Sequence, residues 1–142
     1  MLIKTITMWD LATINRFRAL ASNSRNRDFF ELALMTGMRR SEISGLKWDA
    51  VDTDRRVLMV VRTLQRITGM GLVEGTPKTA KSQRSIDLGK DAVELLNRIR
   101  INQAETRLKL GGLWEDQGFV FTLETGRPID PDEVTNEFRD LV

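Results

Sequence analysis

Most apolar residues in this chain recur at the spacing of α-helices. Residues 28–35 are apolar on almost every side, which predicts a buried helix, and Gly37 supplies the left-handed residue that commonly ends one. Helical spacing recurs in three further stretches that we expect to be helices: 14–20, 91–110 and 134–141. Gly111 closes the second of these, and Asp130 is placed to cap the third.

The middle of the chain has a strand pattern instead. Residues 57–61 form a continuous apolar run, and residues 85–88 alternate between polar and apolar. We expect residues 62–67 to continue the first strand or to pair with it, and residues 76–84 to form a polar, basic hairpin turn. The predicted fold is therefore α+β: a mostly helical core with a small three-stranded antiparallel sheet at its edge.

Composition narrows the class of protein. The chain has 142 residues, 41% of them hydrophobic and 30% charged, which suits one compact domain. No apolar run approaches the ~20 residues that a membrane span needs. The N-terminal residues carry no signal-peptide pattern, so we expect a cytoplasmic protein without contact to a membrane. A net charge of +2 is compatible with nucleic-acid binding but does not argue for it.

Missing residue types exclude several chemistries. The chain contains no cysteine, histidine or tyrosine. Disulfides, thiolate metal sites, Ser-His-Asp catalysis and most zinc chemistry are therefore closed to it. We expect no metal site and no cofactor.

One segment, residues 36–48, carries the first candidate chemistry. Directly after Gly37 come Arg39 and Arg40, at the expected start of a short helix, where an arginine can join main-chain N–H groups in binding an anion. Glu42 follows three residues after Arg39 and can fix its guanidinium. On local physics alone, a surface arginine in an ordinary i,i+3 ion pair explains the same pattern and is the commoner case.

Two motifs extend this segment into a family resemblance. The chain reads Thr-Gly-Met-Arg-Arg-Ser-Glu-Ile at residues 36–43, with Leu-Lys-Trp at 46–48, and Pro-Lys-Thr-Ala-Lys-Ser-Gln-Arg at residues 77–84. In this order and separation, the motifs resemble those of the catalytic domain of the tyrosine recombinases, the phage integrase family. The resemblance extends over about residues 9–142.

The resemblance implies roles for individual residues. Arg39 matches the first catalytic arginine, Glu42 its acidic support, and Lys78 the lysine of a mobile β-hairpin that protonates the leaving sugar oxygen. The family's second motif, His-x-x-Arg, and its nucleophilic tyrosine would lie beyond Val142. Residues 1–142 are thus expected to be a partial catalytic domain, without the N-terminal DNA-clamping domain, and inactive alone.

The resemblance also implies partners. The intact protein would break and rejoin double-stranded DNA at attachment sites through a 3′-phosphotyrosyl intermediate, as a homo-tetramer acting on the nucleoid of a bacterium. We assign DNA binding to four further residues: Arg40, Thr79, Lys81 and Arg84. For Lys81 and Arg84 the alternative is a solvated turn charge, and for Arg62 and Arg66 solvated charge is the favoured interpretation.

Two other functions are compatible with these motifs. One is a non-catalytic DNA-binding module of the same fold. The other is an enzyme like the type IB topoisomerases, which relax DNA; the short basic hairpin and the form of the Pro-Lys-Thr motif favour the integrase side. The target sequence and the direction of recombination are not encoded in any pattern here.

Overall fold

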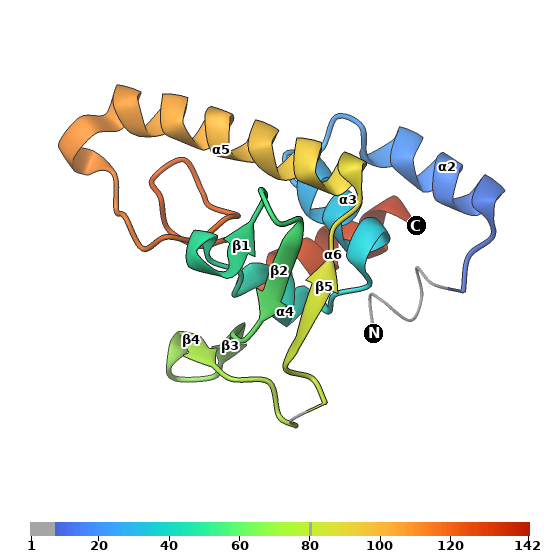
Figure 1. Cartoon of the computed structure of the whole chain (residues 1–142), viewed down its shortest axis with the longest axis horizontal. Coiled ribbons are helices and arrows are strands. Elements are labelled where there is room, and N and C mark those ends of the chain that lie inside the picture. The colour runs from blue at the N-terminus through green and yellow to red at the C-terminus, as the bar shows by residue number, and fades with distance from the viewer. Residues whose placement is uncertain (1–7, 80) are drawn as a thin grey trace.

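Helices and short strands alternate along the chain, as the computed structural model shows for residues 8–79 and 81–142 (Figure 1). The helices are α2 (Leu11–Ala21), α3 (Arg27–Thr36), α4 (Arg40–Ser44), α5 (Lys90–Leu110) and α6 (Pro131–Leu141), with 3-10 turns η1 (Trp48–Ala50) and η2 (Gly111–Leu113). The strands are β1 (Val51–Asp52), β2 (Val57–Val60), β3 (Thr63–Ile67), β4 (Gly71–Gly75) and β5 (Arg84–Asp87). The predicted α+β class is confirmed.

The helix ends follow the local signals in the sequence. Gly37 adopts a left-handed conformation with φ 72° and ends α3 as predicted. The Asp130 carboxylate accepts a hydrogen bond from the main chain of Asp132 at 2.9 Å and caps α6. Asp10 caps α2 in the same way through the N–H of Thr13, at 2.8 Å. These residues therefore define where α2, α3 and α6 begin or end.

The core is built on α3. Its residues Phe29, Phe30 and Leu32 are almost completely buried, as the apolar run predicted. Phe30 meets the Phe17 ring of α2 edge-on at 5.3 Å, and Phe17 lies 5.4 Å from the Phe138 ring of α6, centroid to centroid. The aromatic contacts therefore tie together the helices nearest the two ends of the described chain.

The strands form two sheets rather than the single one expected. β1, β2 and β5 make an antiparallel sheet in that order, while β3 pairs only with β4. The prediction that residues 62–67 join the first strand was therefore wrong. Gly69 and Gly71 have φ of 81° and 77°, so the chain can turn tightly there and pair β3 with the residues that follow at once.

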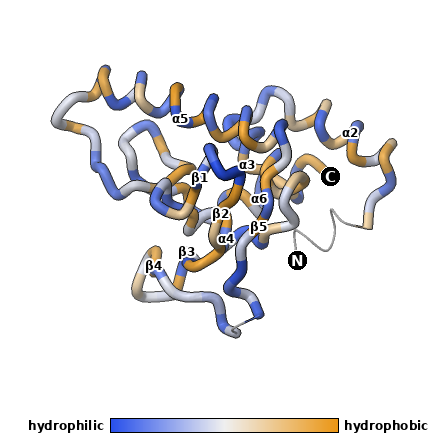
Figure 2. Tube along the Cα trace, in the orientation of Figure 1, coloured by the Kyte–Doolittle hydropathy of each residue, from blue (hydrophilic) through white to orange (hydrophobic). Residues whose placement is uncertain are grey.

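In Figure 1 the long helix α5 runs across the top, past one end of the β1–β2–β5 sheet, and the β3–β4 hairpin lies at the opposite, lower side. Only the first half of α5 contributes to the core, through Ala92, Leu95, Leu96 and Ile99. Beyond it, Ile101 and Leu108 are exposed. Apolar colour accordingly concentrates along α3 and β2 and alternates with polar colour along α5 (Figure 2).

Candidate functional site

Arg39 occupies an exposed position between two helices. It is the residue immediately before α4, with extended backbone angles of φ −74° and ψ 154°. Its main-chain N–H donates to Glu42 Oε1 at 2.8 Å. Within residues 8–79 and 81–142, its guanidinium has no hydrogen-bond or ion-pair partner, and its side chain is exposed. The main chain of Arg39 is thus held in place, while its guanidinium is available to bind a ligand.

Glu42 binds a different arginine from the one expected. Its carboxylate is only 2% exposed, and Oε2 accepts from Arg84 Nη1 at 3.0 Å while Oε1 accepts from Arg84 Nη2 at 3.1 Å. The prediction that Glu42 fixes the Arg39 guanidinium was wrong. An i,i+3 pair requires both residues inside the helix, whereas Arg39 lies before α4 in an extended conformation. Glu42 bends back to cap the Arg39 amide instead.

This cap also changes the expectation of an anion site at the helix start. The negative group that uses the Arg39 N–H is the protein's own Glu42 carboxylate. Attraction for an outside anion at this position falls to the guanidinium of Arg39.

Lys78 lies on the segment that links β4 to β5. Pro77 beside it is buried, while the Lys78 side chain is exposed and has no ion-pair partner in the part of the chain that the structure describes. The segment is not the turn of a hairpin, as the sequence suggested, because β4 and β5 belong to different sheets. Residues 76–84 include Ala80, which is outside the described residues.

Arg39 and Lys78 line one cavity of about 490 Å³, which we call the Arg39–Lys78 cavity. Its walls come from the start of α4, one face of the β3–β4 hairpin, and residues 75–78. α4 packs closely on β3 because Gly45 has no side chain: a Cβ there would lie 2.8 Å from the Thr63 carbonyl carbon. The sheet that the sequence did not predict therefore forms a wall of the site.

The remaining predicted DNA-binding residues are divided between free and engaged side chains. Arg40 is turned to α6, where Nη1 donates to Asp132 at 3.0 Å and to Thr135 at 2.7 Å, and it does not line the cavity. Thr79 lies next to Lys78, with its hydroxyl 2.9 Å from the Ser82 hydroxyl. Lys81 is exposed. Close to Lys78, the positive charge that remains available to bind DNA is therefore that of Lys81, because Arg40 is paired with Asp132.

Two arginines near the hairpin are held by carboxylates rather than simply solvated. Arg62 donates to both oxygens of Asp49, at 2.7 and 2.9 Å, and these hydrogen bonds lower the pKa of Asp49. Arg66 donates to Asp130 at 2.5 Å, and this hydrogen bond raises the pKa of Arg66. Neither arginine lines the Arg39–Lys78 cavity.

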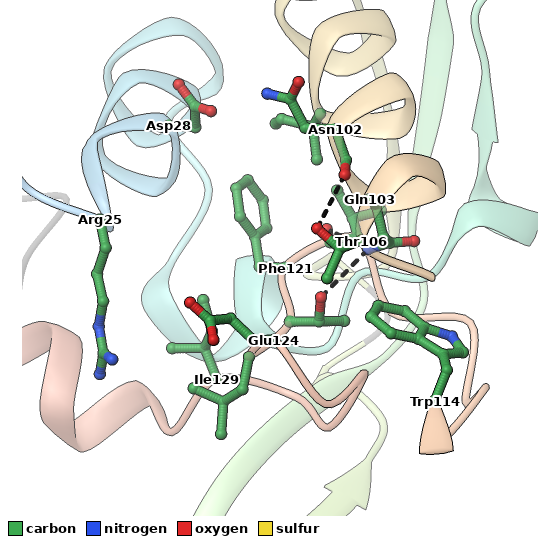
Figure 3. Close-up of a pocket in the computed structure, with 13 residues that line it drawn as sticks. Arg25, Asp28, Asn102, Gln103, Thr106, Trp114, Phe121, Glu124 and Ile129 are labelled. Atoms are coloured by element: carbon green, nitrogen blue, oxygen red, sulfur yellow. Dashed lines mark hydrogen bonds between the residues drawn. The ribbon is translucent and has the colours of Figure 1, made fainter. Parts of the chain in front are cut away.

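A second cavity, of about 190 Å³, is lined by α5, by the loop after it, and by Arg25 and Asp28 near the start of α3 (Figure 3). Within it, the Gln103 amide donates to the Phe119 and Val120 carbonyls at 3.0 and 3.1 Å, whereas the Trp114 indole N–H is buried without a hydrogen-bond partner among the described residues. Gln103 also accepts from the Trp48 indole at 2.9 Å, which explains how that tryptophan packs against α5. This second cavity shares no lining residue with the Arg39–Lys78 cavity. The hydrogen bonds of Gln103 in it connect α5 to the loop that follows.

The described residues offer neither a metal site nor a membrane span. Among residues 8–79 and 81–142, no group of acidic residues is arranged to hold a metal ion. No helix in these ranges is long and apolar enough to cross a bilayer.

Sequence reasoning missed the Glu42–Arg84 pair. One signal was present: a glutamate just before Ile43, on the inward side of a short helix, is seldom buried without a partner. That rule requires a cation but does not say which one, and Arg84 is 42 positions away in sequence.

Known proteins resemble this chain over most of its length. The family model of the phage integrase family matches residues 4–142. A tyrosine recombinase XerC-like protein of Caldanaerobacter subterraneus subsp. tengcongensis is 28% identical over 140 residues, which is 91% of this chain and 36% of that protein. An integrase of Streptomyces ambofaciens is 32% identical over 120 residues, 78% of this chain and 29% of that protein. The chain thus spans about a third of these relatives.

Solved structures share the fold. The Tn1549 transposon integrase in complex with transposon right end DNA has a TM-score of 0.76 at 24% identity, covering 94% of this chain and 43% of that one. The XerA recombinase has a TM-score of 0.65 at 18% identity, covering 94% of this chain and 41% of that one.

Proposed function

Because this chain belongs to the phage integrase family, we propose that it is part of the catalytic domain of a site-specific tyrosine recombinase that breaks and rejoins DNA. The observation that carries the proposal is the Arg39–Lys78 cavity. An exposed, unpaired guanidinium and an exposed ammonium, carried by segments distant in sequence, open onto the same space. Two cations of these types suit the two charge requirements of phosphoryl transfer.

The chemistry divides between the two residues. As a DNA strand is cut, negative charge builds on the non-bridging oxygens of the phosphate, and the planar guanidinium of Arg39 can donate two parallel hydrogen bonds to them. The departing sugar oxygen needs a proton, which the Lys78 ammonium can deliver from an exposed linking segment. Glu42 acts on Arg39 through its main chain, not its guanidinium.

The nucleophile must come from outside these residues. The sequence has no tyrosine, so a 3′-phosphotyrosyl intermediate would need a tyrosine that these 142 residues do not supply. We extend the proposal to an intact protein with that tyrosine, a His-x-x-Arg motif and an N-terminal DNA-clamping domain. It would act as a homo-tetramer on double-stranded attachment sites, in the cytoplasm on nucleoid DNA.

The DNA partner has support from a structural relative and from the surface of the site. The Tn1549 integrase was solved in complex with transposon DNA. On this chain, Thr79 and Lys81 are exposed close to Lys78 and would contact the phosphate backbone. The ion pair with Asp132 holds Arg40 against α6, so in this proposal Arg40 positions α4 against α6 and does not bind DNA.

The test is a covalent adduct assay with the full-length protein that contains this chain. A nicked duplex carrying a candidate attachment site is incubated with protein and resolved on a denaturing gel. Wild type should form a protein–DNA adduct, and Arg39→Ala should slow its formation on the order of 10²- to 10³-fold. Arg62→Met is the matched control, since it removes an arginine that Asp49 already holds. Binding without any adduct would favour a non-catalytic DNA-binding module.

A further inference from the structure

The buried Glu42 carboxylate accepts three hydrogen bonds, and in the chemistry proposed above it acts only through the main chain of Arg39. A carboxylate that is 2% exposed is stable only when it is paired and hydrogen-bonded. Here the Arg39 amide supplies one hydrogen bond, and the Arg84 guanidinium supplies two, at 3.0 and 3.1 Å. The first bond is local to the start of α4, and the other two join α4 to Arg84, the first residue of β5.

Arg84 also holds the segment that carries Lys78. Its Nη1 donates to the Ser82 carbonyl at 2.7 Å. The N–H of Ser82 donates to the Thr79 carbonyl at 3.0 Å, and this hydrogen bond closes a turn. One guanidinium therefore contacts both the carboxylate that caps Arg39 and the turn that begins one residue after Lys78.

We infer that Arg84 is a positioning residue: through Glu42 and Ser82 it sets the placement of Arg39 relative to Lys78. This rests on the proposed function. Arg84 does not line the Arg39–Lys78 cavity, and its charge is compensated by Glu42, so it acts on the phosphate only through its neighbours. Its charge also prevents Glu42 from competing with DNA for the Arg39 guanidinium.

The rival role is the one that the sequence suggested, direct binding of the DNA backbone by Arg84. The two roles give opposite results in one set of variants of the full-length protein: R84M, E42Q and the double variant. If Arg84 binds a DNA phosphate, its removal weakens binding and lowers the slope of log K against log salt by about one. If Arg84 only positions its neighbours, its removal leaves that slope unchanged and slows the chemistry.

Each variant is measured for its salt-dependent Kd and for its single-turnover cleavage rate on a nicked duplex at saturating protein. For R84M we expect an unchanged salt slope and cleavage slowed on the order of 10- to 100-fold. The double variant should cleave at least as fast as R84M, because it removes the buried charge that R84M leaves unpaired. R62M, which breaks an arginine–carboxylate pair elsewhere, should match wild type in both measurements.

Two results would overturn the inference. One is a reduced salt slope with a normal cleavage rate at saturation. The other is a double variant whose fold-reduction in cleavage rate equals the product of the reductions in R84M and E42Q. Residues that act through one shared interaction do not contribute independently, so their effects should not multiply.

A second measurement needs neither cleavage nor DNA. In the 142-residue chain, R84K keeps the charge but removes the two-pronged geometry. Hydrogen exchange of the Arg39 amide should become faster in R84K, while amides of the first half of α5 stay as protected as in wild type. An unchanged Arg39 amide would refute the inference. Wild type that forms no adduct, together with a faster Arg39 amide in R84K, would refute the proposed function alone.

Discussion

Gly45 lies against the main chain of Thr63 so closely that a Cβ on it would come within 2.9 Å of the Thr63 Cα. This contact packs α4, which follows Arg39, onto β3, which forms a wall of the Arg39–Lys78 cavity. The obstructing atoms belong to the main chain and cannot rotate away. Close packing at Gly45 thus contributes to the stability of the contact between α4 and β3, and it determines the shape of the cavity beside them.

Replacing Gly45 by alanine should destabilise the chain by about 1–3 kcal/mol, because either α4 or β3 must shift to admit the methyl group. Urea unfolding followed by circular dichroism measures the change. Gly112→Ala is the matched control: its Cβ would meet nothing within 4 Å, and it should be close to neutral. Equal effects at the two positions would contradict the importance of the contact with Thr63.

Local signals predicted the helices of this fold better than its sheets and ion pairs. Gly37 and Asp130 act on their immediate neighbours, so the residue type and its position were enough to place the end of α3 and the start of α6. The β3–β4 hairpin was missed because β4 is short, begins and ends with glycine, and has no clear alternation.

The site depended on information of two kinds. The motifs around Arg39 and Lys78 made both residues candidates for catalysis only through the resemblance to a family. Local physics alone favoured an ordinary surface ion pair for Arg39. Partner choice was not predictable, because Glu42 binds Arg84 and Arg40 binds Asp132 across long sequence separations. Such pairs are decided by how the elements pack, which a pattern along the chain does not contain.

The ion pair of Asp49 and Arg62 provides a prediction about pH. Hydrogen bonds from Arg62 hold the pKa of Asp49 below its ordinary value of 3.8 in the folded chain. Ionised Asp49 therefore contributes stability above about pH 4, and this is lost as the pH falls through the lowered pKa. R62M should raise the pKa of Asp49 toward its ordinary value in an NMR titration of the carboxyl carbon. R66M, which frees Asp130 instead, should leave it unchanged.

The 142-residue chain should form no covalent adduct with DNA by itself. It contains no tyrosine, so the expected nucleophile is missing even where Arg39 and Lys78 are in place. Incubation with a nicked duplex, followed by a denaturing gel, tests this, with the full-length protein as the positive control. A band of the size of chain plus DNA would mean that another side chain, such as a serine hydroxyl, serves as the nucleophile.

Substitution of Lys78 should separate catalysis from binding. In the full-length protein, K78A removes only one of many phosphate contacts, so the Kd for DNA should change only a few-fold. It removes the proton donor completely, so single-turnover cleavage should slow on the order of 10²- to 10⁴-fold. A substrate with sulfur in place of the departing 5′-oxygen needs no proton, and K78A should cleave it at nearly the wild-type rate. K81A, a neighbouring exposed lysine, should weaken binding slightly and leave the rate at saturation unchanged. If K78A also cleaves the ordinary substrate at the normal rate once bound, Lys78 is a backbone contact and the proton comes from elsewhere.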